Sequence, residues 1–292
     1  MKKNFFTNPN EFIRFIIADF VARSPLNRLA AFGGAPIFEE PLVGFADGKD
    51  AIFESFREVV HPHHLTPGEI MAKELGFEIG DITVVSFVLP INGDTKKENA
   101  REKDGPSLRW NHTRWHGQNF IDALSRHLVS ALTELGIPAL APELTSSFAI
   151  ENGPWGYASR WSQRHIAYAA GLGTFGLSDA LITEKGCAMR CGSVVVAHKM
   201  EITPRPYTDH HAYCLYFRTG KCKVCMKRCP RGAITPQGHD KVKCFEILTV
   251  DQRPYLEGAH GPGYTGKYAG CGLCQTAVPC EGGIPSLNEI TP

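Results

Sequence analysis

The 292-residue chain has no long hydrophobic run and no excess of charge of either sign. Its longest apolar stretch, residues 82–91, is far shorter than the roughly 20 residues that a membrane-spanning helix needs. Lys and Arg total 31 against 30 for Asp and Glu, so no overall field attracts nucleic acid or an anionic membrane. Asn8, Asn10 and Arg14 interrupt any apolar signal region, and the chain has no twin-arginine pair. We therefore expect a cytoplasmic protein with no membrane partner.

What the chain does have is ten cysteines, eight of them within residues 214–280. In the bacterial ferredoxin run C-x2-C-x2-C-x3-C-P, the first three cysteines bind one cluster and the last cysteine binds a second cluster. This chain keeps the last three cysteines of that run, in Cys222-Lys223-Val224-Cys225-Met226-Lys227-Arg228-Cys229-Pro230. Thr219 stands where the first cysteine would be, and Val278 stands where a last cysteine would follow Cys274. We expect Cys214 and Cys280 to replace these two missing ligands.

This pattern predicts two [4Fe-4S] clusters with four thiol ligands each. The first thiol group is Cys214, Cys222, Cys225 and Cys280, and the second thiol group is Cys229, Cys244, Cys271 and Cys274. Zinc is the alternative, but its C-x2-C pairs are usually separated by roughly 15–20 residues, far fewer than separate Cys225 from Cys271. Disulfides are disfavoured in a reducing cytosol. Cys187 and Cys191 lie outside the array and are interpreted as structural thiols.

The hydrophobic periodicity predicts an α+β architecture in two domains. Residues 1–200 are expected to form the core, and residues 201–292, dense in Pro, Gly and Cys, are expected to be held together by clusters. Thr66 and Glu69 have the form of a capping box, and Gly76 is expected to end that helix. Other helices are expected over residues 10–22, 50–60 and 119–135 and from Ser159 to Gly171, and strands over 82–89, 139–140, 180–183 and 192–197.

Three further segments contain histidine side chains. Trp110-Asn111-His112-Thr113-Arg114-Trp115-His116 stands just before the helix predicted over 119–135, where it would suit a substrate pocket or stacking on a nucleobase. Acidic residues close upstream weigh against a nucleic-acid partner. The histidines of residues 61–64 and 209–211 invite a metal interpretation, but proline and the loop context favour exposed polar turns.

A set of motifs along the second half of the chain resembles the epoxyqueuosine reductase and reductive dehalogenase superfamily. They are Ala170-Gly171-Leu172-Gly173-x-x-Gly176, Leu181-Ile182-Thr183, Gly186, Gly192-x-Val194-Val195 and Cys229-Pro230-x-Gly232-Ala233-Ile234, followed by the remaining cysteines. The resemblance implies a nitroreductase-like αβα core that holds base-off cobalamin. It also implies a ferredoxin-like module at the C-terminal end, with two [4Fe-4S] clusters that supply electrons.

The resemblance also implies roles for individual residues. Counting back from the glycine run places Tyr157 where epoxyqueuosine reductases keep a catalytic aspartate, and reductive dehalogenases use a tyrosine as proton donor. A phenol suits that role because it stays protonated at neutral pH. An ordinary tyrosine in a glycine-proline loop is the alternative. The expected cofactor-binding residues are Arg160, Arg164, His165, Gly171, Gly173, Gly176, Thr183 and Gly192.

The function expected from the resemblance is that of a cobalamin-dependent reductase of a small organic substrate. An external ferredoxin or flavodoxin would supply the electrons. One alternative is an electron-transfer protein or reductive activator that serves a separate corrinoid protein. A second alternative, a tRNA-modifying queuosine-type reductase, would need a basic face that the balanced charge does not indicate.

Overall fold

A four-stranded antiparallel sheet forms the centre of the computed structural model, which describes residues 2–77, 80–154, 156–251, 263–266 and 268–289. In order across the sheet, the strands are β3 (Leu42–Asp47), β4 (Thr83–Pro90), β10 (Met189–Val196) and β5 (Ala139–Leu140). All eight residues of β4 are buried, as expected of a strand with both faces covered. The strand predicted over residues 82–89 is confirmed.

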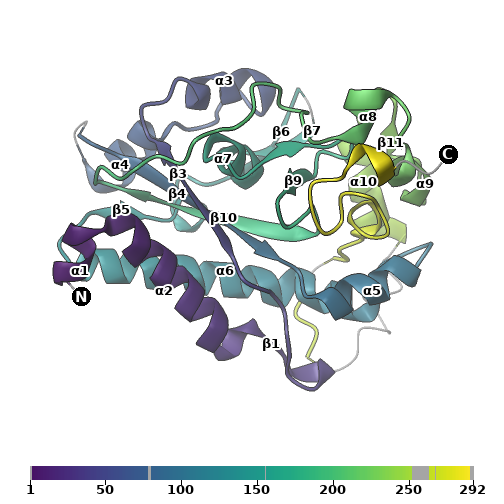
Figure 1. Cartoon of the computed structure of the whole chain (residues 1–292), viewed down its shortest axis with the longest axis horizontal. Coiled ribbons are helices and arrows are strands. Elements are labelled where there is room, and N and C mark those ends of the chain that lie inside the picture. Colours follow the sequence, from purple (N-terminus) through teal and green to yellow (C-terminus); the bar gives the residue numbers. More distant parts are fainter. Residues whose placement is uncertain (1, 78–79, 155, 252–262, 267, 290–292) are drawn as a thin grey trace.

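Helices cover both faces of this sheet (Figure 1). On one face, Val85 and Phe87 of β4 pack with α2 (Pro9–Arg23) and α6 (Leu108–Glu134) in one apolar core. On the other face, Val84 of β4 and Val195 of β10 pack with α3 (Ile52–Val59), α4 (Pro67–Leu75) and α7 (Gln163–Ala169). Successive strand residues alternate between the two cores, since side chains of a strand point to opposite faces. The predicted mixed helix-and-sheet architecture is confirmed.

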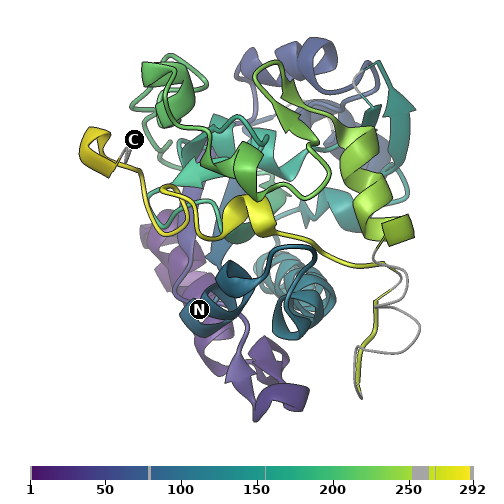
Figure 2. The ribbon, with the colours of Figure 1, turned by 90° about the vertical axis from the view of Figure 1, so that its right-hand side faces the viewer.

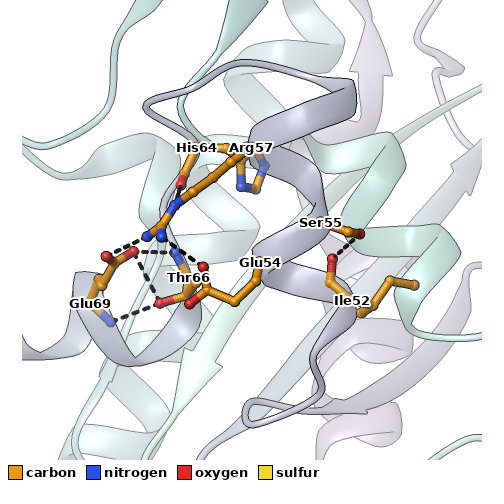
Figure 3. A network of polar contacts seen from close by, with 7 residues as sticks. All are labelled: Ile52, Glu54, Ser55, Arg57, His64, Thr66 and Glu69. Carbon is orange, nitrogen blue, oxygen red and sulfur yellow. Dashed lines mark hydrogen bonds and ion pairs between the residues drawn. The ribbon is translucent and has the colours of Figure 1, made fainter.

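The junction of α3 and α4 shows how local sequence fixes these helices (Figure 3). Thr66 and Glu69 form the predicted capping box, and Gly76 ends α4 in the left-handed conformation, with φ of 61°. Arg57 on α3 bridges Glu54 of its own helix and Glu69 of α4, and its Nε donates to the carbonyl oxygen of His64. One arginine therefore ties the two helices together at the rim of the core.

Two predicted helix starts are wrong. The helix expected from residue 119 begins at Leu108, because Ser107 caps it by accepting a hydrogen bond from the backbone N–H of Trp110 at 3.1 Å. Residues 110–116 therefore lie within α6 instead of before it. The helix expected from Ser159 begins at Gln163, because Ser159 lies in a strand and its hydroxyl donates to the carbonyl oxygen of Trp161.

Short elements complete the fold. Four two-stranded hairpins pair β1 (Arg28–Leu29) with β2 (Ala35–Pro36), β6 (Ile150–Gly153) with β7 (Gly156–Ser159), β8 (Gly173–Phe175) with β9 (Leu181–Thr183), and β11 (Ile234–Thr235) with β12 (Gly238–His239). The remaining helices are α1 (Lys2–Thr7), α5 (Gly93–Arg101), α8 (Leu215–Thr219), α9 (Val224–Arg228) and α10 (Lys241–Glu246). Among the described helices, none combines the length and apolarity needed to cross a bilayer.

The C-terminal segment returns to the core after α10. Figure 2 shows it, in yellow, passing between the green cysteine-rich region and helices α5 and α6. The backbone N–H of Gly270 donates to the side-chain oxygen of Asn111 at 2.8 Å, and Trp115 Nε1 donates to the carbonyl oxygen of Tyr268 at 2.7 Å. The motif at residues 110–116 thus serves largely to dock this segment. The domain boundary expected at residue 200 stays a prediction.

Candidate cysteine-lined active site

The structure brings the first thiol group together around α8 and α9. Cys214 precedes α8, Cys225 lies in the first turn of α9, and Cys280 comes from the C-terminal segment. Burial, followed by repulsion from Cys280, Cys214 and Cys222, raises the pKa of Cys225 to about 12. A neutral thiol is therefore favoured until a metal binds and displaces the proton.

The second thiol group also converges, although its members are far apart in the sequence. Burial, followed by repulsion from Cys244 and Cys229, raises the pKa of Cys271 to about 11. The same two thiols, together with Cys271 and with Cys225 of the first group, act on Cys274, whose pKa burial raises well above its usual value. Cys225 is therefore near enough to Cys274 to act on it electrostatically.

The spacing of the thiols bears on the choice between zinc and iron–sulfur. A tetrahedral zinc site with Zn–S bonds of about 2.3 Å requires sulfurs about 3.8 Å apart. Among the described residues, which include all ten cysteines, no three thiol sulfurs lie within 4.8 Å of one another. The thiols of this structure are therefore spaced more widely than the ligands of such a zinc site, and the iron–sulfur assignment stays a prediction from the sequence pattern.

A cavity of about 460 Å³ lies between the second thiol group and the α/β core. All four thiols of that group line it on one side. The opposite wall carries Arg190 of β10, Arg114 of α6 and Glu143 from the turn after β5. Its volume lies within the range of roughly 300–1,000 Å³ that holds small organic ligands.

Glu143 is held by a chain of buried hydrogen bonds. Trp161 Nε1 donates to Ser193 Oγ at 2.9 Å, and Ser193 Oγ donates to Gln163 Oε1 at 2.7 Å. The side-chain oxygen of Gln163 thus accepts from Ser193, and the side chain of Gln163 also forms a hydrogen bond with the carboxyl group of Glu143. Burial raises the pKa of Glu143 to about 7, although attraction to Arg190 opposes the shift. This carboxyl group can therefore hold or release a proton at neutral pH.

Three polar atoms that belong to residues lining the cavity, but are themselves buried, have no hydrogen-bond partner among the described residues: Arg190 Nε, Arg114 Nη1 and Thr113 Oγ1. Burial, followed by repulsion from Arg114, lowers the pKa of Arg190 to about 9. Unsatisfied buried donors are costly, so a ligand that offers oxygen acceptors would be favoured here. Arg190 and Glu143 were not predicted from the sequence. Arg190 lies before the strand predicted over residues 192–197, and the structure begins that strand at Met189.

Most of the predicted catalytic and cofactor-binding residues lie elsewhere. Tyr157 is 48% exposed on β7, with its ring 5.1 Å from that of Phe245, and is not among the residues that line the cavity. Arg160 is paired with Glu151 at 2.6 Å. His165 is buried against Phe175, and burial lowers its pKa to about 3.

Arg164 is the predicted cofactor residue that does line the cavity, and its guanidinium group donates to the carbonyl oxygen of Asp179.

The predicted cofactor-binding glycines have packing reasons of their own. A Cβ on Gly173 would lie 2.3 Å from the carbonyl oxygen of Ile182, and one on Gly192 would lie 2.5 Å from the ring of Phe87. Gly171 has φ of 78° and abuts Pro204, whereas Gly176 has ordinary space. The hydroxyl of Thr183 donates to the carbonyl oxygen of Gly186 within a turn. None of these five predicted residues lines the cavity, so their cofactor roles stay predictions.

The junction of α5 and α6 supports the second thiol group. The buried amide of Asn99 donates to the carbonyl oxygen of Cys271 at 3.3 Å and to Thr276 Oγ1 at 3.0 Å, and it accepts from the backbone N–H of Ser107 at 2.9 Å. Gly272 has φ of 61°, and a Cβ there would overlap the ring of Trp110 at 2.0 Å. Sequence patterns gave no signal for Asn99.

One expectation about the histidines is wrong. His61 and His64 are buried, at 5% and 1% exposure, whereas exposed turns were predicted. His64 stacks on Trp161, and its Nε2 accepts from the backbone N–H of Ser162. His61 and His63 lie beside Glu151, whose carboxylate also accepts two hydrogen bonds from Arg160. That guanidinium group already neutralises the carboxylate that a cation would need.

Comparisons with known proteins bear on what this site is. No protein-family model matches the chain. An epoxyqueuosine reductase of Francisella cf. novicida is 29% identical over 129 residues, which are 44% of this chain and 34% of that protein. The enzyme of Bacillus anthracis is also 29% identical over 129 residues, or 44% of this chain and 32% of that protein. The matched segment thus spans about a third of the length of these relatives.

Solved structures give distant likenesses. Epoxyqueuosine reductase from Bacillus subtilis has a TM-score of 0.46 and 18% identity, covering 86% of this chain and 63% of that one. A catabolic reductive dehalogenase has a TM-score of 0.49 and 15% identity, covering 84% of this chain and 30% of that one. The sequence matches confirm the resemblance read from the sequence: over about 130 residues the chain is similar to epoxyqueuosine reductases.

Proposed function

We propose that this protein is an iron–sulfur oxidoreductase that reduces a small molecule bound in the cavity beside the second thiol group. The observation that carries the proposal is the convergence of eight thiols in two groups, one of which opens onto a cavity with Arg190, Arg114 and Glu143 on its opposite wall. Iron–sulfur clusters store and pass single electrons. The proximity of Cys225 and Cys274 would favour electron transfer between the two clusters. An external ferredoxin or flavodoxin is the proposed electron donor.

Cobalamin is the second proposed cofactor. The guanidinium groups of Arg190 and Arg114, two residues that line the cavity, would suit the amide and phosphate acceptors of a corrin. When bound, cobalamin would supply a low-potential cobalt centre for the reduction. A corrin is larger than a ligand that fills 460 Å³, so the cavity accommodates it only in part. The protein's own contribution is to bind acceptors at the two arginines and to keep a carboxyl group beside them.

Anaerobic purification after growth with cobalamin, followed by metal analysis and EPR, tests these proposals. About eight irons and one cobalt per chain are expected. Eight irons without cobalt would favour the alternative of an electron-transfer protein, although the cavity weighs against a simple relay. Zinc in place of iron would end both. The cytoplasmic location expected from the sequence stays a prediction.

Two residues are candidates for the proton donor. Tyr157 follows from the resemblance, and Glu143 follows from its place in the cavity wall. Because proton transfer needs a donor within hydrogen-bond reach of the substrate, we propose Glu143 as the donor in this chain. Once a substrate is known, Glu143→Gln is expected to lower turnover at least 100-fold while Tyr157→Phe retains it. The reverse result would restore the role predicted for Tyr157.

A further inference from the structure

Cys187 is a ninth thiol at the edge of the first thiol group. It is 1% exposed, and its Sγ lies 3.6 Å from Sγ of Cys280, within hydrogen-bonding range for sulfur. The first group already supplies four thiols, which is a full ligand set for one [4Fe-4S] cluster. Cys187 is therefore in excess of the ligands and touches one of them.

The backbone fixes this contact from both sides. The N–H of Cys187 donates to the carbonyl oxygen of Cys280 at 2.8 Å, and the N–H of Ala188 donates to the carbonyl oxygen of Glu281 at 3.3 Å. Gly186 makes this approach feasible, because a Cβ there would lie 2.0 Å from the carbonyl oxygen of Glu281. The backbone of residues 186–188 thus packs against and hydrogen-bonds the segment that carries Cys280.

The surroundings of Cys187 leave its S–H few partners. The Cys187 side chain belongs to an apolar cluster with Leu177, Ile182 and Val278, and the other acceptor in its reach is the carbonyl oxygen of Gln275 at 3.9 Å. A thiolate bound to iron carries more negative charge than a distant carbonyl oxygen, so Cys280 is the better acceptor.

We propose that Cys187 is a positioning residue that donates its S–H to the iron-bound sulfur of Cys280 and so raises the reduction potential of the first cluster. The proposal rests on the proposed function, because it requires a cluster at the first thiol group. Hydrogen bonds to cluster sulfurs stabilise the more negative, reduced state, and this is one of the factors that set cluster potentials. The displaced ligand would thereby gain a side-chain donor in addition to its backbone donor.

The test compares the anaerobically purified full-length protein with Cys187→Ala and Cys187→Ser. Cys225→Ala, which removes a ligand of the first cluster, assigns the EPR signals. In Cys187→Ala the iron content is expected to stay at the wild-type value. At a fixed potential, the ratio of reduced to oxidised first cluster is expected to fall about three- to tenfold, roughly 30–60 mV for one electron. Cys187→Ser keeps a donor and is expected to recover part of the shift.

Cys191→Ala is the control, because it removes a partly buried thiol on the cavity wall whose electrostatic neighbours are Arg164, Glu143 and Arg190 instead of the first group. It is expected to leave the potential of the first cluster unchanged. Equal potentials in wild type and Cys187→Ala would overturn the inference. So would loss of the first cluster's iron in that variant, since it would make Cys187 a ligand. A wild-type protein without iron would instead refute the proposed function itself.

Discussion

The two thiol groups lie in contrasting surroundings. The first is enclosed by apolar side chains, among them Leu177, Ile182 and Val278. The second faces the cavity with Arg190, Arg114 and Glu143, and Cys244 has His239 as a hydrogen-bonding neighbour. Cations near a cluster favour the reduced state, whereas an apolar shell disfavours added charge. The difference predicts a lower potential for the first cluster, so that electrons run from it toward the cavity.

Removing one ligand from each thiol group is the strongest test of the difference between the two clusters. Cys225→Ala and Cys274→Ala are each expected to lose about half of the iron, because a cubane held by three thiols is labile and the two groups have separate ligand sets. Iron and sulfide analysis, with EPR of the remaining cluster, measures the outcome. The cluster that survives in Cys274→Ala should have the lower potential of the two. Loss of all iron from both variants would show a single cooperative unit instead.

A backbone substitution tests whether the second group depends on its close packing against α6. Gly272→Ala would place a Cβ on the ring of Trp110 and strain a left-handed backbone, at a cost of about 2–5 kcal/mol in unfolding free energy. Gly282→Ala, next to the first group, meets open space and is the matched control. Urea unfolding and iron retention of the second cluster should separate the two variants. Equal stability would mean that the C-terminal segment shifts freely away from Trp110.

A pH titration tests the charge of Glu143, which lies in the surroundings of the second thiol group. The pKa of Glu143 is raised to about 7 by burial, whereas an unfolded glutamate titrates near 4.5. The protonated carboxyl group therefore favours folding fully below pH 4.5, and this contribution is lost as the pH rises through 7. Glu143→Gln should match the wild type at pH 4 and exceed it by about 3 kcal/mol at pH 8.

Denaturant unfolding across this range measures the difference, with the exposed Glu184→Gln as control. A pH-independent difference between Glu143→Gln and the wild type would mean that the pKa of Glu143 is the same in the folded and unfolded protein.

The same contrast explains what could be predicted from the sequence. The cysteine spacing and the displaced positions at 219 and 278 define the two thiol groups in the sequence, and their roles as cluster ligands stay predictions. Periodicity was sufficient for α2, α4 and β4, where local pattern and burial agree. Arg114 belongs to a motif that the sequence suggested for a substrate pocket, but Arg190 and Glu143 were not predictable, because they come from separate elements that meet it only through packing. The glycine run was assigned to a cofactor from the resemblance. Its tight contacts with Pro204 and Ile182 could not be predicted, because they depend on tertiary neighbours.

Two buried side chains, one beside each thiol group, provide the test with the smallest expected effect. Asn99 holds the Cys271 loop of the second group, and Thr174 holds the residue before Cys214 of the first by accepting from the backbone N–H of Tyr213 at 2.9 Å. Asn99→Ala leaves the N–H of Ser107 unpaired, and Thr174→Val does the same to Tyr213, so each should cost roughly 1–3 kcal/mol. Because each residue touches one loop, Asn99→Ala should broaden the EPR signal of the second cluster and Thr174→Val that of the first. Redox-poised EPR of the two variants makes the test, and broadening of both signals by either variant would show that the two groups share one support.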